Sequence, residues 1–175
     1  MLKITLPSAG GLEEYGYVLA MSLWLAFQCY LTGFVLVEYR RAKTYTQEYL
    51  DKHYLAEHKK AFPNDKGVPK LGYPDMGNGY YSSHLTYKQW FDFNIVQRIH
   101  GNFLEQILFV VLFVLIAGLK HASYAVILGG VYSLGRILMA IGYMISVGYR
   151  RPGVILLNLS LGGLLFLSVD TLLKL

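Results

Sequence analysis

Three side chains of different chemistry lie at helical spacing in the middle of the sequence. Arg98, Asn102 and Glu105 occupy positions i, i+4 and i+7, so a helix would place a cation, an amide and a carboxylate on one face. The apolar run 107–119 follows directly. Ionisable side chains at the end of a membrane span are costly, and they normally face protein or water rather than lipid. The spacing therefore predicts a functional site at the mouth of a membrane span.

A second polar set lies nearer the end of the chain. Arg136, Met139 and Tyr143 lie at i, i+3 and i+7, and a helix would place them on one face. Arg150 follows seven residues after Tyr143, with Arg151 beside it. These residues add cations and an aromatic hydroxyl to the candidate site. Arg136 is also explained by a purely structural role, as the partner of a buried carboxylate or of carbonyl groups.

The elements that must position these residues are membrane-spanning helices. Of the 175 residues 54% are hydrophobic and only 15% are charged, and the mean hydropathy is +0.37, which is typical of a membrane protein rather than a soluble domain. An apolar helix of about 20 residues crosses a bilayer core of about 30 Å. The sequence therefore predicts one all-α domain over 1–175, a four-helix membrane bundle with spans at about 15–37, 91–119, 124–147 and 154–173.

A long polar connection, residues 44–90, separates the first two predicted spans. Thr44 and Gln47 have the spacing of a capping box and predict a short helix that ends near Lys60. Several Gly and Pro residues then predict irregular loop. Two interpretations of the connection remain open: a solvated cap, or a docking surface for another protein.

Composition excludes several other classes. Cys29 is the only cysteine, so no intrachain disulfide and no cysteine-based zinc site is expected, and the five histidines are too scattered to predict a metal site. The net charge of +5 comes largely from basic residues in 40–90 and at Arg150 and Arg151. This clustering is typical of cytosolic loops of membrane proteins, and no nucleic-acid partner is expected.

The first sixteen residues hold one lysine and no arginine, unlike an arginine-rich transit peptide. The first span could therefore act as an uncleaved signal anchor. We expect an integral protein of the endoplasmic reticulum, with a mitochondrial membrane as the alternative.

Three stretches of the sequence resemble a known family. The run F-N-x-V-Q-R-x-H-x-N-x-L-E at 93–105 is similar to the R-x-x-x-N-x-x-E signature of the membrane-associated eicosanoid and glutathione metabolism (MAPEG) proteins, and most similar to the type 3 microsomal glutathione S-transferases. Residues 135–143 resemble the family's G-R-x-x-Y-A-x-G-Y motif, with Met139 in place of the tyrosine expected at the fifth position. Residues 72–82 resemble the Y-P-x-M-Y-S loop of the type 3 enzymes with residues added. Residues 44–69 exceed the usual length of the family's connection.

The resemblance implies a membrane enzyme that uses glutathione as co-substrate. Its ligands would be Arg98, Asn102, Glu105, Tyr143 and a basic residue at the end of the first span, Arg41 or its neighbour Arg40. Arg150 or Arg151 would lie at the sulfur. A nearby guanidinium lowers the pKa of a thiol from about 8.5, so the arginine would supply the thiolate without a metal. The second substrate would be apolar and lipid-like, and the site would lie between the subunits of a homotrimer.

Two functional hypotheses follow. The first is a glutathione transferase or peroxidase that directs the thiolate at apolar electrophiles or lipid hydroperoxides. The second is a non-catalytic relative, a lipid-binding or structural subunit of a larger membrane complex, possibly mitochondrial. The long connection and Met139 motivate the second hypothesis, in which Arg98 and Glu105 would be only a structural ion pair.

Overall fold

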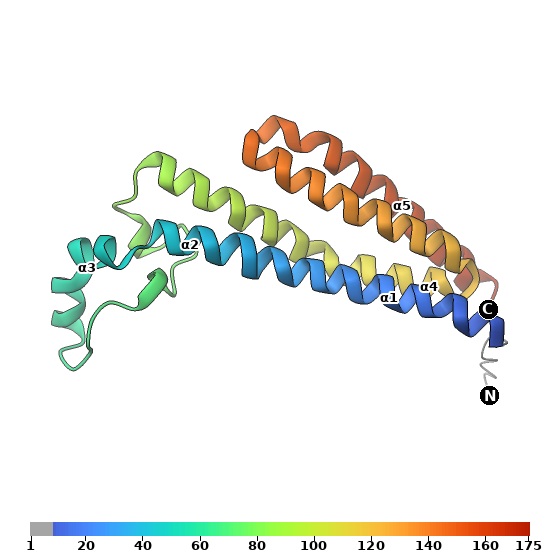
Figure 1. The fold of residues 1–175 in the computed structure, drawn as a ribbon, viewed down its shortest axis with the longest axis horizontal. Coiled ribbons are helices and arrows are strands. Elements are labelled where there is room, and N and C mark those ends of the chain that lie inside the picture. The colour runs from blue at the N-terminus through green and yellow to red at the C-terminus, as the bar shows by residue number, and fades with distance from the viewer. Residues whose placement is uncertain (1–8) are drawn as a thin grey trace. The chain divides into compact units, whose positions relative to one another are not determined.

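The computed structural model describes residues 9–175, with side chains from Glu14 onward. Every regular element in this part of the chain is a helix, so the predicted all-α class is confirmed (Figure 1). The expectation about the N-terminal presequence concerns residues 1–16, of which 1–8 lie outside the described residues. The elements in order are α1 (Ala9–Leu31), the π-helix η1 (Thr32–Val37), α2 (Glu38–Thr44), α3 (Gln47–Ala61), the 3-10 helices η2 (Lys70–Gly72) and η3 (Tyr80–Ser82), α4 (Tyr87–Ile145), the 3-10 helix η4 (Val147–Arg150) and α5 (Arg151–Leu173).

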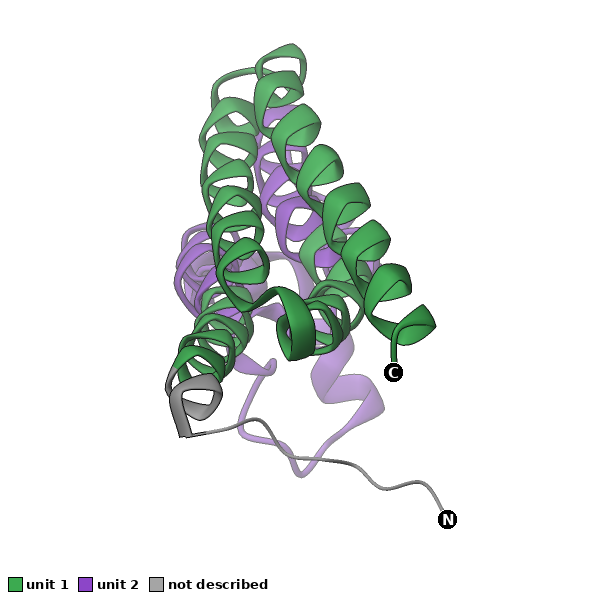
Figure 2. Cartoon of the chain, turned by 90° about the vertical axis from the view of Figure 1, so that its right-hand side faces the viewer, with its two compact units in different colours: residues 1–30, 102–175 green, residues 31–101 purple. Residues whose placement is uncertain are grey.

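The chain forms two compact units (Figure 2). Unit 1 comprises residues 1–30 and 102–175, and unit 2 comprises residues 31–101. Helix α4 begins in unit 2 and continues in unit 1. Each unit is described by itself below.

Three described helices are long and apolar enough to cross a membrane: Glu14–Thr44, Tyr87–Ile145 and Val147–Leu173. Many of their large apolar side chains are exposed, among them Leu108, Leu159 and Phe166, each at least 70% exposed. A soluble protein rarely exposes so much apolar helix surface, whereas hydrocarbon chains of lipid cover such a surface at no cost. The chain is therefore an integral membrane protein.

Within unit 1, helix α4 turns back on itself. At about 1.5 Å per residue, a straight helix of 59 residues would measure about 90 Å, three times a bilayer core. His121 has non-helical angles, φ −129° and ψ 47°. Beyond it the chain reverses, because Arg136 contacts Asn102 and Tyr132 contacts Gln106. We call 102–120 and 122–145 the first and second limbs of α4; the predicted break between spans falls at this turn.

Helix α5 packs closely against the second limb (Figure 1). A Cβ atom on Gly153 would lie 2.2 Å from the backbone nitrogen of Met139, and one on Gly135 would lie 2.9 Å from that of Leu157. Glycines of this kind let helix backbones approach in membranes, where van der Waals packing takes over from the hydrophobic effect. On α1, the Trp24 indole donates a hydrogen bond of 2.9 Å to Ser133 of the same limb.

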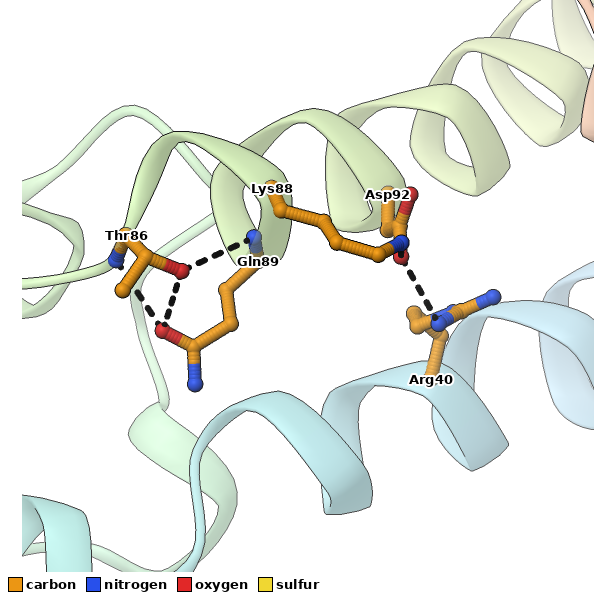
Figure 3. A network of polar contacts seen from close by, with 5 residues as sticks. All are labelled: Arg40, Thr86, Lys88, Gln89 and Asp92. Atoms are coloured by element: carbon orange, nitrogen blue, oxygen red, sulfur yellow. Dashed lines mark hydrogen bonds and ion pairs between the residues drawn. The ribbon is translucent and has the colours of Figure 1, made fainter.

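Unit 2 corrects one predicted helix start. Thr46, not Thr44, caps α3: its hydroxyl accepts from the Tyr49 amide at 3.2 Å. Thr44 is instead the last, buried residue of α2. Helix α4 begins with a capping box, formed by Thr86 and Gln89, that was not predicted from the sequence. The Thr86 hydroxyl accepts from the Gln89 amide at 3.3 Å, and the Gln89 side chain accepts from the Thr86 amide at 3.0 Å (Figure 3), which satisfies two otherwise unpaired donors.

The connection in unit 2 has an apolar core of its own. It is irregular between α3 and α4, as predicted, but it is not merely a solvated segment. Gly72 adopts a φ of +68°, which favours glycine, and a Cβ there would lie 2.6 Å from the Tyr45 ring. The loop backbone at Gly72 therefore packs directly against the Tyr45 ring. The core consists of the buried residues Tyr45, Leu50, Tyr54, Val68, Phe93 and Val96.

Candidate functional site

A buried guanidinium lies at the centre of the polar cluster in unit 1. Arg136 projects from the second limb of α4 and is only 2% exposed. It donates to the Asn102 side-chain oxygen at 2.8 Å, to the Gln106 side-chain oxygen at 2.5 Å and to the Tyr132 hydroxyl at 2.9 Å. The Phe103 ring lies 4.5 Å from its central carbon. These direct partners are all uncharged, so the cluster retains a positive charge.

This cluster orients two of the predicted site residues. The Asn102 oxygen is held by Arg136, and its amide nitrogen therefore turns toward Glu105, to whose carboxylate it donates at 3.3 Å. Glu105 itself is exposed. The arrangement links a buried cation through one amide to an accessible carboxylate. For Arg136 the sequence left open a place in the site or a structural role toward a carboxylate or carbonyls, and here it bonds amide and hydroxyl oxygens and the backbone carbonyl of Asn102.

Gln106 and Tyr132 were not singled out in the sequence. A usable signal was present, because Gln106 follows Asn102 by four residues and Tyr132 precedes Arg136 by four. Each pair therefore shares a helix face. Only the pairing of the two limbs of α4 brings these faces together, and that pairing depends on the reversal at His121.

Tyr143 and Arg150, also predicted, meet at the end of the second limb. The Arg150 guanidinium lies over the Tyr143 ring at 4.8 Å, a cation–π contact that fixes the charge without neutralising it. Among the described residues no carboxylate forms an ion pair with Arg150, which is half-buried, whereas Arg151 is exposed at the start of α5. Tyr143 follows Arg136 by seven residues, about 10 Å along a helix. The ring contact therefore holds the Arg150 guanidinium beside Tyr143.

Met139 lies between these two groups in the sequence. It is 4% exposed, and its backbone nitrogen adjoins Gly153 of α5. Met139, which stands where the family motif has a tyrosine, is therefore a buried packing residue between two helices in this chain.

Arg41 is enclosed by unit 2. It is 1% exposed, and its guanidinium donates to the carbonyls of Asp75 at 2.7 Å and Leu71 at 3.3 Å. The Tyr73 ring stacks on it at 4.3 Å. Arg41 therefore anchors the 71–76 loop, and a ligand could reach it only if that loop moved.

The neighbouring Arg40 is more accessible. Its side chain is 35% exposed and lies 3.5 Å from the carboxylate of Asp92, which Lys88 also contacts at 2.7 Å (Figure 3). Of the two arginines left open in the sequence, Arg40 has the surface that a ligand needs. Arg98 also lies in unit 2 and is exposed.

Asp75 is the polar centre of unit 2. Its carboxylate accepts from the amides of Gly77 at 2.7 Å, Gly79 at 3.0 Å and Ser82 at 2.9 Å. Burial alone would raise the pKa of Asp75, but these hydrogen bonds outweigh burial and hold the pKa below its usual value. Burial raises the pKa of the neighbouring Tyr45 to about 12. This network organises the loop rather than presenting reactive groups.

Among the described residues no group of three or more His, Cys, Asp or Glu side chains is placed to hold a metal ion.

Comparison with known proteins gives one family. The sequence profile of the MAPEG family matches residues 17–169. No curated protein was found to match the chain significantly. The match extends over both units and includes the buried Arg136 cluster, Tyr143 and Arg150.

Proposed function

Because the chain belongs to the MAPEG family, which includes glutathione transferases and eicosanoid enzymes, we propose that it is a membrane glutathione transferase or peroxidase. It activates the glutathione thiol for attack on apolar electrophiles or lipid hydroperoxides. The observation that carries this proposal is the pair of polar groups in unit 1, Arg136 with Asn102 and Tyr143 with Arg150. Together they provide fixed positive charge for an anionic, thiol-bearing ligand.

The proposed roles follow from the chemistry of glutathione. Glu105 receives the ligand's ammonium group, and Asn102, held by Arg136, presents its amide beside it. Arg150 lies at the sulfur and favours the thiolate, because a guanidinium stabilises the charged form and lowers the thiol pKa. Arg136 is a positioning residue: it is 2% exposed and acts through Asn102. Tyr143 holds the Arg150 guanidinium in place.

Two predicted ligands are supported less directly, and one position departs from the family motif. Arg98 stays a proposal from its spacing in the sequence. At the end of the first span, exposure favours Arg40 over the buried Arg41. The buried Met139 offers no hydroxyl to a ligand, so the affinity for glutathione is expected to be lower than with a tyrosine at this position.

The proposal includes four membrane crossings, since the reversal at His121 allows α4 to supply two. It also includes a homotrimer with the site between subunits, and a location in the endoplasmic reticulum. Resemblance to the type 3 microsomal enzymes is the argument for the trimer and the location.

Calorimetric titration of the purified protein with glutathione tests the proposal. Saturable binding is expected in the wild type, and Asn102→Leu should weaken it at least about tenfold, because a charge-assisted network near the ligand contributes about 1.5–3 kcal/mol. Asn158→Leu is the matched control, since Asn158 is exposed on α5 and bonds only its own helix, at the Val154 carbonyl. Absence of binding in the wild type would contradict the proposal.

The alternative is a non-catalytic subunit of a larger membrane complex. The observation that favours it is the separate core of unit 2, since an ordered connection of this length can hold a partner. Purification of a stable hetero-complex without turnover would support it, and an active homotrimer would contradict it.

A further inference from the structure

Unit 2 contains a cavity whose lining includes none of the residues proposed to bind glutathione. Its volume is about 600 Å³, within the range of small-molecule sites. It opens between the end of α3 and the 74–81 segment, so it belongs to the connection between α2 and α4. Its walls are contributed by residues of unit 2 alone.

Aromatic rings make up much of the wall. Tyr54, Tyr80 and Tyr81 contact one another at ring-centre distances of 5.7, 5.1 and 6.4 Å, with interplanar angles of 55°, 67° and 71°. These rings pack against one another, and the exposed Tyr80 and the half-buried Tyr81 present the ring surface that a ligand can reach. Tyr54 is buried, whereas Tyr80 and Phe62 are 63% and 56% exposed. A ligand would cover apolar surface that is now open to water.

The charged residues in the lining determine which class of ligand the cavity can bind. Glu57, Asp75 and His58 line the cavity, and the His58 ring lies 3.3 Å from the carboxylate of Asp65. No lysine or arginine is among the described lining residues, although the whole chain carries a net charge of +5. The Asp75 carboxylate is occupied by the loop. Glu57 is exposed, and its carboxylate accepts one hydrogen bond, from the Tyr80 hydroxyl at 2.6 Å. Anions such as glutathione, fatty acids and phosphates are therefore disfavoured here.

We propose that this cavity binds a small organic cation, a quaternary or highly alkylated ammonium group. Cations are attracted to the faces of aromatic rings, and alkylated ammonium groups suit aromatic cages because little hydration is lost. Glu57 supplies the countercharge at the rim, and Tyr80 and Tyr81 supply the ring faces, supported from behind by the buried Tyr54. Such an ammonium group can come from two sources, the choline headgroup of a lipid or a free organic amine.

The test is equilibrium binding of radiolabelled choline to the full-length protein in a maltoside detergent, which carries no choline headgroup. Saturable binding is expected, and the neutral isostere 3,3-dimethylbutan-1-ol should compete at least about tenfold less well, because it lacks the charge that a cation–π contact requires. Equal competition by choline and the isostere would overturn the proposal, because only an apolar pocket would remain. Absence of saturable choline binding would overturn it too.

Variants localise the site. Glu57→Gln and Tyr80→Ala should each weaken choline binding about tenfold, whereas Tyr80→Phe keeps the ring and should retain most of the binding. Tyr87→Ala is the matched control, since Tyr87 is 75% exposed and outside the cavity's lining. Unchanged choline binding in both Glu57→Gln and Tyr80→Ala would overturn the assignment to this cavity.

Lipid nanodiscs distinguish the two sources. In phosphatidylcholine discs a lipid headgroup would occupy the cavity and suppress binding of free choline relative to phosphatidylglycerol discs. Equal binding in both discs identifies a free amine as the ligand. Both results support a cation site and differ only in its source.

Discussion

At the residue scale, buried polar groups organise both units, and they do so with different kinds of partner. Arg136 is surrounded by neutral oxygens, whereas Asp75 is surrounded by donors, most of them backbone amides. A buried charge is tolerated only when hydrogen bonds replace its hydration. Arg136 could be recognised in the sequence as an unusual charge within a span. Asp75 could not, because its donors are set by a loop conformation that no periodicity reveals.

Asp75 makes the stability of the connection depend on pH. Its folded pKa lies below the usual value, so the carboxylate contributes stability above the unfolded pKa of about 3.9, and this contribution is lost as the pH falls through the folded pKa. Asp75→Asn should lower the free energy of local unfolding at pH 7 by about 2–3 kcal/mol, since donors lose their acceptor. Hydrogen exchange of amides in 71–86, followed by mass spectrometry, measures it.

The difference between wild type and Asp75→Asn should shrink on acidification below about pH 4. Glu48→Gln is the control, because Glu48 is exposed in the first turn of α3. An Asp75→Asn protein with wild-type protection at neutral pH would show that the carboxylate does not hold the loop.

At the element scale, close backbone contact fixes α5 against the second limb of α4. Gly153 and Gly135 lie where a side chain would meet backbone atoms of the opposite helix. Gly162, on the same helix, has nothing within 4 Å of an added Cβ among the described residues. Gly153 and Gly162 of α5 therefore have different roles.

Gly153→Ala should separate α5 from the second limb and lower the thermal midpoint of the protein in detergent by several degrees, because the added methyl would lie 2.2 Å from the Met139 backbone nitrogen. Gly162→Ala should keep or raise the midpoint, since alanine is favoured over glycine in a helix by about 1 kcal/mol. A thermal melt monitored by circular dichroism measures both. Equal midpoints in the two variants would contradict the close packing.

The sequence predicted helices better than their ends and loops. The apolar runs that predict spans 91–119 and 124–147 lie in α4 on either side of His121, because local hydropathy dominates the choice of membrane segments. The predicted N-cap of α3 was wrong by two residues, because Thr44 is the last residue of α2 and is buried there, so Thr46 caps α3 instead. The core of the connection was missed, since Tyr45, Val68 and Phe93 meet only through long-range packing.

At the scale of the whole molecule, two units with separate cores divide the chemistry. Two of the polar groups proposed to bind glutathione, Asn102 with Glu105 and Tyr143 with Arg150, belong to unit 1. Unit 2 contains the cavity lined by tyrosines and Glu57. The cavity lies in the 44–90 connection, which the composition predicted only to be a polar loop. Residues of the family motif lie in these groups of unit 1, whereas the cavity of unit 2 is formed by the end of α3 and an irregular loop, whose conformation no sequence periodicity predicts.

The most direct measurement is the ultraviolet absorbance of glutathione thiolate bound to the purified protein at neutral pH. The wild type and Arg151→Ala should both show the thiolate signal, since Arg151 is exposed and apart from the Tyr143 contact. Arg150→Ala should lose it, because the thiol would return toward its ordinary pKa of about 8.5. A full thiolate signal in Arg150→Ala, or glutathione bound to the wild type only as the thiol, would contradict the proposed activation by Arg150.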